Sequence, residues 1–304
     1  MRNLVSMDTI QIEVTNACPN NCANCTRFTH HVKKPFMMSY EQFMDAVDSM
    51  VGYPKMTGIM GGEPLLHPEF EKMCKYLHEK IPPRQCGLWT CLPPGKEHYR
   101  EVIVETFGNV FFNDHSRSDI YHHPFLVSAR EIKDIDEWVK WVMIDQCWGQ
   151  LSWSASINPH GAFFCEIAAS LSMLLSNRKD GWPVKPGWWT KTVKDFKEQI
   201  ESYCLLCGGA MPLKRRVSTS VKDEISPQML ERIASFSPKV KRGEYDVSDC
   251  LMCADDSAMQ TYKDPAYRDA ITARYGMFTM ENDLHFLTPY LSKSWKGGQK
   301  HGVE

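Results

Sequence analysis

Three cysteines set close together near the start of the chain constrain the fold more than any other feature. Their spacing is Cys18-x3-Cys22-x2-Cys25, and they follow the stretch DTIQIEVT at residues 8–15. We expect that stretch to form a buried strand that ends where the cysteine loop begins. Three thiolates on one loop can converge on one face of a cubane iron–sulfur cluster, which needs four ligands, so one iron would stay open to a small molecule. Zinc, which prefers paired CxxC units, and three core cysteines are the alternatives.

The residues after this loop alternate between helical and strand-like segments. An apolar run over 56–60 ends in the tetrad GGEP at residues 61–64. Helices are expected over 39–50 and near 68–79, 96–107, 130–145 and 226–235, and strands near 86–91, 109–113 and 151–157. Such alternation implies parallel pairing and an α/β fold with reactive groups at the carboxyl ends of the strands. The alternation weakens after about residue 160.

The cysteine spacing directly after a first strand, with GGEP after the second, resembles the signature of the radical S-adenosylmethionine (SAM) superfamily. The resemblance implies a partial (β/α)6 barrel in which Cys18, Cys22 and Cys25 hold a [4Fe–4S] cluster whose open iron is chelated by SAM. It also implies that reductive cleavage of SAM yields a 5′-deoxyadenosyl radical, which removes a hydrogen atom from the substrate. A flavodoxin or ferredoxin is the expected reductant.

The resemblance assigns further residues to SAM. Gly61, Gly62, Glu63 and Pro64 match the motif that binds the methionyl amino group, where a tight glycine turn admits the ammonium and Glu63 complements its charge. Residues at the ends of later strands would face SAM or substrate, and these are Trp89, Thr90, Asn113 and Asp114. One residue departs from the family: the position before the third cysteine, usually aromatic or large and apolar and packed near the adenine, is Asn24.

A second group of cysteines resembles the auxiliary-cluster domains called SPASM or twitch. In these domains a strand, a turn such as NPHG at 158–161, a second strand and a cysteine entering a helix precede a CxxC pair. The resemblance implies that four cysteines hold a second [4Fe–4S] cluster, and these are Cys147, Cys165, Cys204 and Cys207. Such a cluster would relay electrons or shape the substrate pocket, because it has no open iron. A structural zinc or a merely buried CxxC pair is the alternative.

Three regions are therefore expected: a radical SAM barrel over 1–145, an auxiliary-cluster region over 146–235, and a C-terminal extension over 236–304 that is a candidate lid. Two cysteines, Cys250 and Cys253, lie in the extension. Cys250 is the candidate hydrogen-atom donor to a substrate radical, as some radical SAM epimerases require, and an ordinary surface or core pair is the alternative. Seven other residues are expected to be buried small hydrophobes or ordinary loop residues, namely Cys74, Cys86, Cys91, His30, His31, His122 and His123.

Composition narrows the class of protein. Hydrophobic residues make up 43% and charged residues 24% of the 304 residues, as in an ordinary soluble globule. A formal charge of -2 argues against gripping nucleic acid by bulk electrostatics. The chain shows neither a run of 18 apolar residues nor a signal peptide at its first residues, so we expect a cytoplasmic protein without a membrane partner.

The expected function is hydrogen abstraction from a polar small molecule, such as a sugar, an aminoglycoside or a nucleoside. A redox-neutral epimerisation or rearrangement is the favoured outcome, which would make the enzyme an isomerase, and an oxidoreductase is the other class. A peptide-modifying maturase is the first alternative. An enzyme that modifies nucleic-acid bases is another, with phosphate contacts from Lys214, Arg215 and Arg216. A sensor that holds iron–sulfur or zinc would need the cysteines but not GGEP.

Overall fold

The computed structural model describes residues 1–113, 115, 117–133, 135–176 and 179–253. Asp114 and most of the expected extension, residues 254–304, lie outside the described residues. None of the helices in this described part is both long and apolar enough to cross a membrane.

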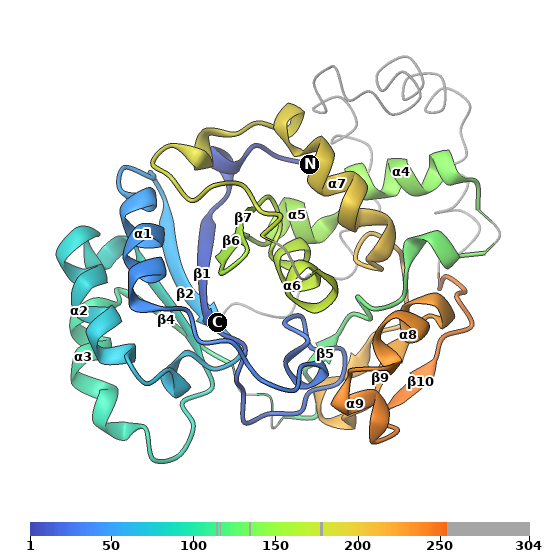
Figure 1. Cartoon of the computed structure of the whole chain (residues 1–304), viewed down its shortest axis with the longest axis horizontal. Coiled ribbons are helices and arrows are strands. Elements are labelled where there is room, and N and C mark those ends of the chain that lie inside the picture. The colour runs from blue at the N-terminus through green and yellow to red at the C-terminus, as the bar shows by residue number, and fades with distance from the viewer. Residues whose placement is uncertain (114, 116, 134, 177–178, 254–304) are drawn as a thin grey trace.

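A six-stranded sheet forms the centre of the molecule, in the order β4-β3-β2-β1-β6-β7 (Figure 1). The strands are β1 (Thr9–Thr15), β2 (Met56–Gly61), β3 (Cys86–Thr90), β4 (Asn109–Phe112), β6 (Ala155–Asn158) and β7 (Gly161–Phe163). The first five strands of that order are parallel, and β7 pairs with β6 antiparallel. The expected α/β class is confirmed. The last two strands come from a hairpin on the free side of β1 and not from further strand–helix units beyond β4.

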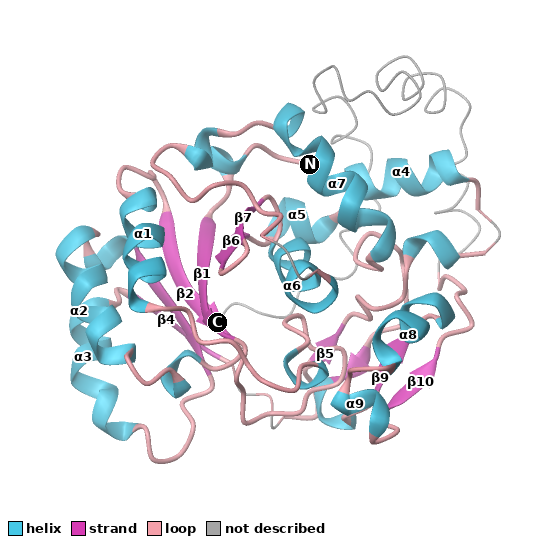
Figure 2. Ribbon diagram, viewed as in Figure 1, coloured by secondary structure: helices cyan, strands magenta, loops and turns pink. Residues whose placement is uncertain are grey.

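Three helices follow the first three strands and cover one side of the sheet, as Figure 2 shows. They are α1 (Tyr40–Met50), α2 (Phe70–Lys80) and α3 (Arg100–Thr106). Helix α1 begins where the sequence predicts, because the Ser39 side chain accepts a hydrogen bond from the Gln42 N–H and the Gln42 side chain accepts one from the Ser39 N–H. The cysteine loop therefore lies between the end of β1 at Thr15 and the capped start of α1 at Tyr40.

Strand β1 is buried along its whole length, yet its two faces differ. Ile10, Ile12 and Val14 belong to the hydrophobic core, whereas Gln11 and Glu13 contact polar side chains on the concave side of the sheet. Successive side chains of a strand point to opposite faces of the sheet. Because the polar residues of β1 are buried as well, the second face of the strand is covered by polar groups. The sheet thus encloses polar groups, and not a second apolar core, on its concave side.

Around residue 150 the structure differs from the prediction. Residues 137–145 form α4 (Glu137–Asp145), which starts later than expected, and residues 148–152 form the short helix α5 (Trp148–Ser152) instead of the first half of a strand. The ring centroids of Trp148 and Trp153 are 4.5 Å apart. Five residues of extended chain would hold the two rings roughly 16 Å apart, so a helical turn is needed for this contact.

The remaining elements lie beside the sheet. Helices α6 (Glu166–Leu175) and α7 (Lys197–Tyr203) follow the hairpin, and α8 (Pro227–Ala234) and α9 (Pro238–Lys241) come later, each of the last two with a serine before a first-turn proline. Two small sheets pair β5 (Tyr121–His122) with β8 (Arg216–Val217) and β9 (Asp223–Ile225) with β10 (Tyr245–Val247). The second small sheet joins residues on both sides of the expected boundary at 235; the three-region division stays a prediction.

Candidate active site

A cavity of about 380 Å³ lies at the concave side of the sheet. All three cysteines of the N-terminal loop line it, and so do most of the residues expected to meet SAM, namely Gly61, Gly62, Glu63, Trp89, Thr90 and Asn113. Pro64 is buried directly behind the glycine turn, at the start of a 3-10 turn. Groups as far apart in sequence as Cys18 and Asn113 therefore share one cavity.

The three thiols of the loop repel one another as anions. Burial, reinforced by the nearby Cys25 thiolate, raises the pKa of Cys22 to about 12. Burial and the same neighbour raise the pKa of Cys18 well above its usual range. Soft thiolates crowded in this way are stabilised when a bound metal shares their charge. The donor set of Cys18, Cys22 and Cys25 thus fits an iron–sulfur cluster with one iron left open.

The two glycines of GGEP lie against the start of the cysteine loop. The N–H of Gly62 donates to the Thr15 carbonyl at 2.7 Å, and the N–H of Glu63 donates to the Ala17 carbonyl at 2.7 Å. A Cβ atom on Gly61 would overlap the Thr15 carbonyl oxygen, and one on Gly62 would overlap that of Ala17. Glycine is required at both positions because the two backbones approach so closely. The turn and the cysteine loop are consequently one rigid unit.

The Glu63 carboxylate is 1% exposed and accepts three hydrogen bonds. Its Oε1 accepts from the Thr90 hydroxyl at 2.7 Å and the Leu65 N–H at 3.1 Å, and its Oε2 accepts from the Cys91 N–H at 2.7 Å. All three donors are neutral, and none of the ion pairs found within the described ranges involves Glu63. A buried anion on a cavity wall without a countercharge is suited to bind a ligand cation.

Trp89 forms the wall of the cavity next to this turn. Its ring stacks on Phe111, with centroids 4.3 Å apart and an interplanar angle of 15°. The ring occupies the space left by two glycines of neighbouring strands, since a Cβ on Gly58 would lie 2.5 Å from it and one on Gly87 3.0 Å from it. Asn24, in contrast, does not line the cavity: its Oδ1 accepts from the Glu224 N–H at 2.9 Å.

A buried cluster of charges forms the other end of the cavity and was not predicted. The Arg27 guanidinium donates to Gln11 Oε1 at 2.7 Å and lies 3.4 Å from Glu166 Oε1 and 3.7 Å from Glu13 Oε1. Ser156 donates to Glu13, and Ser154 donates to Glu166. Burial raises the pKa of Glu13 above its ordinary value, and the charge of Arg27 opposes that shift. Two carboxylates thus share one guanidinium.

The second group of cysteines lines a smaller cavity of about 30 Å³, whose other walls are mostly apolar and include Phe125, Ile144 and Phe164. All four predicted members are there, namely Cys147, Cys165, Cys204 and Cys207. Burial, reinforced by the Cys147 thiolate, raises the pKa of Cys165 to about 12. Within the described part of the chain, no three His, Cys, Asp or Glu side chains stand close enough to hold a single metal ion. The four thiols surround a space and do not meet at one point.

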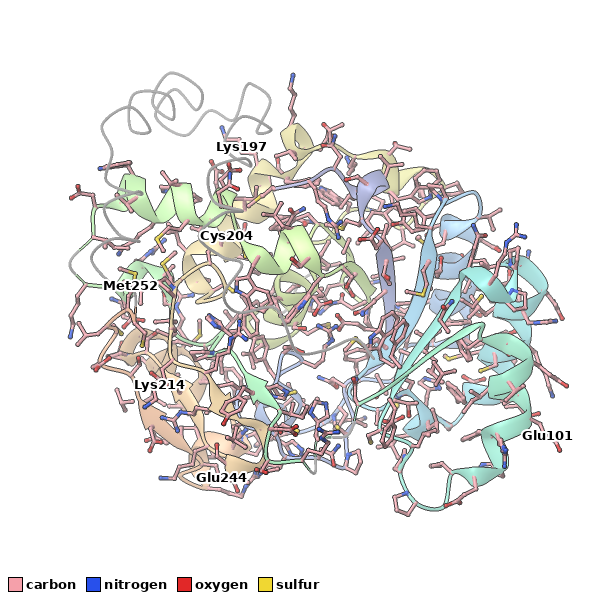
Figure 3. The ribbon with its side chains drawn as sticks, turned by 180° about the vertical axis from the view of Figure 1, so that it is seen from behind. Glu101, Lys197, Cys204, Lys214, Glu244 and Met252 are labelled. Atoms are coloured by element: carbon pink, nitrogen blue, oxygen red, sulfur yellow. The ribbon has the colours of Figure 1, made fainter. Side chains whose placement is uncertain are left out.

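The second cavity is separate from the first in the fold. It lies between the helices that follow α4, and Figure 3 shows Cys204 on the side of the molecule opposite Glu101 of α3. Cys147 precedes α5 and Cys165 precedes α6, so two of its thiols lie at helix N-termini. The residues could hold a cluster of soft metal ions with four protein ligands.

The remaining cysteines and the basic run lie elsewhere. Cys250 is 2% exposed, and its carbonyl accepts from the Lys133 N–H at 3.1 Å; Cys253 is exposed, and neither residue lines the large cavity. Cys91, expected to be an inert core residue, does line it. In the basic run, Arg216 pairs with Glu224 and Asp246.

Comparison with known proteins finds a similarity in the N-terminal part. Residues 12–115 match the family model described as Radical SAM superfamily, and no curated protein matches significantly. Among solved structures, the "Crystal structure of BtrN in complex with AdoMet and 2-DOIA" has a TM-score of 0.39 and 12% identity, over 56% of this chain and 78% of that one. The "Crystal structure of SeMet BtrN in an OPEN conformation" has a TM-score of 0.36 and 15% identity, over 57% and 81%. The cysteine loop, the glycine turn and strands β2 to β4 all fall in the segment that is similar to this superfamily.

Proposed function

We propose that this chain is a radical SAM enzyme that removes a hydrogen atom from a polar small molecule. The observation that carries the proposal is the single cavity lined by Cys18, Cys22, Cys25, the glycine turn and the uncompensated Glu63 carboxylate. A [4Fe–4S] cluster and SAM, which the superfamily implies, would supply the electron and the carbon radical for hydrogen abstraction.

The protein's own residues have separate tasks in this proposal. The three cysteines hold the cluster and leave one iron open. Glu63 complements the SAM ammonium, and its three neutral hydrogen-bond donors keep the carboxylate in place without removing its charge. Trp89, fixed by its stack on Phe111, excludes water from the wall of the cavity. These groups are held in position before any ligand binds, which lowers the cost of binding.

The far end of the cavity favours a small hydroxylated substrate that carries an amino group. Gln11, Arg27, Ser154 and Glu166 line that end and offer both hydrogen-bond donors and acceptors. Glu166 lines that end, and Glu13 lies against the same Arg27 guanidinium, so a ligand cation improves the balance of charge. An aminoglycoside or an amino sugar has this chemistry, whereas an ordinary nucleoside offers the hydroxyl groups without the cation.

We further propose that Cys147, Cys165, Cys204 and Cys207 bind an auxiliary [4Fe–4S] cluster. Four thiols around one buried space are the ligands that a fully coordinated cube requires. A small electron-carrier protein such as a flavodoxin or ferredoxin would deliver the electron. We propose hydrogen abstraction alone, because Cys250, the expected donor for an epimerisation, does not line the cavity.

Anaerobic incubation tests the proposed function directly. Reconstituted protein, reduced with dithionite in the presence of SAM, is expected to release methionine and 5′-deoxyadenosine in equal amounts, measured by liquid chromatography and mass spectrometry. Protein that binds iron but releases neither product on reduction would contradict the proposal and favour a sensor.

Glu63→Gln should weaken SAM binding without unfolding the protein. Glutamine keeps the size and one carbonyl acceptor but loses the charge that complements the ammonium. A charge-assisted hydrogen bond contributes about 1.5–3 kcal/mol, so the dissociation constant should rise roughly ten- to over a hundredfold. Isothermal titration calorimetry measures it, with the exposed Glu71→Gln as the matched control. An unchanged affinity in Glu63→Gln would remove the assigned role.

Replacing Cys204 and Cys207 together with serine tests the auxiliary site. The iron content of reconstituted protein should fall from about eight to about four atoms per chain, the content of one cube. SAM binding, which depends on the other cavity, should persist. Plasma emission spectroscopy shows whether the unaltered protein holds zinc instead. About one zinc per chain at these cysteines would refute the proposed auxiliary cluster and would leave the proposed SAM site unaffected.

A further inference from the structure

The backbone between Cys22 and Cys25 is held by residues that lie far along the chain. The Lys239 ammonium donates to the Cys22 carbonyl at 2.8 Å, and the Ala23 N–H donates to the Ser218 carbonyl at 2.7 Å. His122 Nδ1 donates to the Ala23 carbonyl at 2.8 Å, and the Asn24 N–H donates to the Asp223 carboxylate. Every residue between the second and third cysteine is therefore bound from outside the segment that matches the superfamily.

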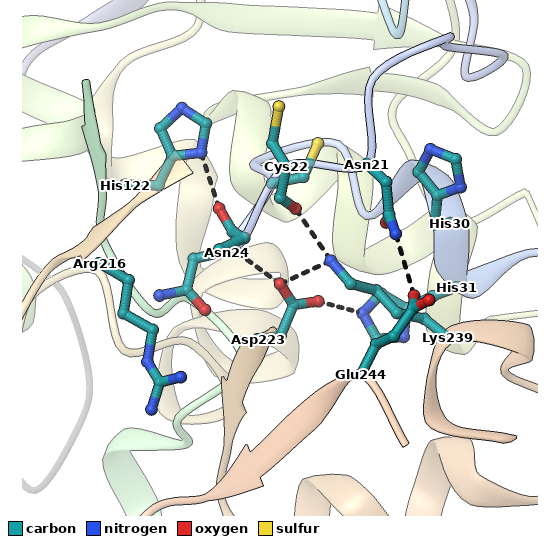
Figure 4. Close-up of polar contacts among 12 residues, drawn as sticks. Asn21, Cys22, Asn24, His30, His31, His122, Arg216, Asp223, Lys239 and Glu244 are labelled. Carbon is teal, nitrogen blue, oxygen red and sulfur yellow. Dashed lines mark hydrogen bonds and ion pairs between the residues drawn. The ribbon is translucent and has the colours of Figure 1, made fainter. Parts of the chain in front are cut away.

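Asp223 is the centre of this arrangement, which Figure 4 shows. Its Oδ1 accepts from Lys239 at 2.8 Å, and its Oδ2 lies 2.6 Å from His31 Nε2. His31 Nδ1 in turn lies 2.8 Å from the Ser237 hydroxyl. The side chains of Asp223, His31 and Lys239 are only 1–2% exposed. Strand β9 and helix α9 thus place a buried ion pair directly beneath the cysteine loop.

Asn24 explains how the loop accommodates this contact. Its φ of 50° lies in the left-handed region, which asparagine tolerates better than most residues. Its side chain bonds to the backbone of β9 and points away from the cavity. The residue that departs from the superfamily pattern therefore joins the cysteine loop to a segment about 200 positions later, in place of a contact with SAM.

We propose that Asp223 and Lys239 are positioning residues for the cluster that Cys18, Cys22 and Cys25 hold, and that they also set the charge beside it. The proposal rests on the proposed function. Fixing the backbone of residues 22–24 directs two of the three ligand thiols toward the same cluster before it binds, as a preorganised site requires. Asp223 and Lys239 then belong to the cluster site, although they lie about 200 positions after the cysteine loop.

The ion pair also makes an electrostatic contribution whose sign can be tested. The reduced cluster carries one more negative charge than the oxidised cluster, and nearby charge is one of the factors that set its reduction potential. Lys239→Met removes a buried cation and leaves Asp223 negative, so it should shift the potential to more negative values. Asp223→Asn leaves the cation uncompensated and should shift the potential to more positive values.

The experiment compares these two variants with the unaltered protein as full chains reconstituted anaerobically. The potential of the cluster whose electron paramagnetic resonance spectrum changes on SAM addition is measured by redox titration. Iron release to a chelator is followed in parallel. We expect opposite shifts of the potential in the two variants and faster loss of that cluster in both. Asp246→Asn, in the same small sheet but without a contact to residues 18–25, is the control and should match the unaltered protein.

Equal potentials in the unaltered protein and both variants would overturn the proposal, and so would shifts of the same sign. If circular dichroism shows that either variant fails to fold, Ser237→Ala is used in its place. This smaller change removes the hydroxyl that contacts His31 and caps α9, and it keeps both Asp223 and Lys239. It should release iron faster than the unaltered protein, and an equal release rate would also overturn the proposal. Failure of the unaltered protein to cleave SAM would refute the proposed function and this inference with it; normal cleavage with unaffected variants would refute the inference alone.

Discussion

Changing Cys18, Cys22 and Cys25 together to alanine is expected to abolish SAM cleavage and to lower the iron content from about eight to about four atoms per chain. The three thiols line one cavity, and no single other side chain of that cavity could replace all three as ligands. The proposed second cluster should survive, because its four cysteines line a different cavity. Iron analysis and the release of 5′-deoxyadenosine measure the two effects.

Cys86→Ala is the matched control for that variant. Cys86 is fully buried in β3 and lines neither cavity, so its loss should leave the iron content and SAM cleavage unchanged. An iron content that stays the same in the triple variant would show that the N-terminal cysteines hold no cluster, whatever the control does.

Arg27→Met should lower the free energy of unfolding by roughly 3–5 kcal/mol, the cost of leaving buried charge without its partner. Methionine fills much of the same volume, but Glu13 and Glu166 would then face each other without a cation. Adding Glu13→Gln and Glu166→Gln to Arg27→Met should recover most of the loss, because the uncompensated charges are then gone. Urea unfolding followed by circular dichroism measures all three proteins.

The control for this prediction is Arg117→Met, which breaks an exposed pair with Asp119. Surface pairs contribute about 0–1 kcal/mol, so this variant should unfold almost like the unaltered protein. Similar losses in Arg27→Met and Arg117→Met would mean that the buried cluster has no special energetic role.

The local parts of the site could be predicted from the sequence. The cysteine loop follows β1 and the glycine turn follows β2, and the two strands are parallel neighbours, so both motifs reach the same edge. Period-two alternation and a serine cap are enough to locate β1 and α1. The alternation shows which residues share a face, but it carries no information on which strand pairs with which.

The distant contacts could not be predicted for that reason. Arg27 meets Glu166 only because the hairpin of β6 and β7 joins the free side of β1, and nothing in either residue's neighbours indicates this pairing. Cys250 was chosen by elimination among cysteines without a ligand role. The thiol outside both ligand sets that lines the large cavity is Cys91, placed there by the end of β3.

The contacts of the cysteine loop also determine when the loop can take shape during synthesis. Lys239 follows Cys22 by 217 positions in the chain, and Ser218 and Asp223 also come late. At ribosomal rates of 5–20 residues per second, roughly 10–40 s separate the appearance of Cys22 from that of Lys239. The nascent chain thus exposes three thiols for that time without the residues that arrange them. Iron delivered before Lys239 appears would meet a loop without these contacts, so insertion of the proposed cluster is expected only after residue 239 has been made.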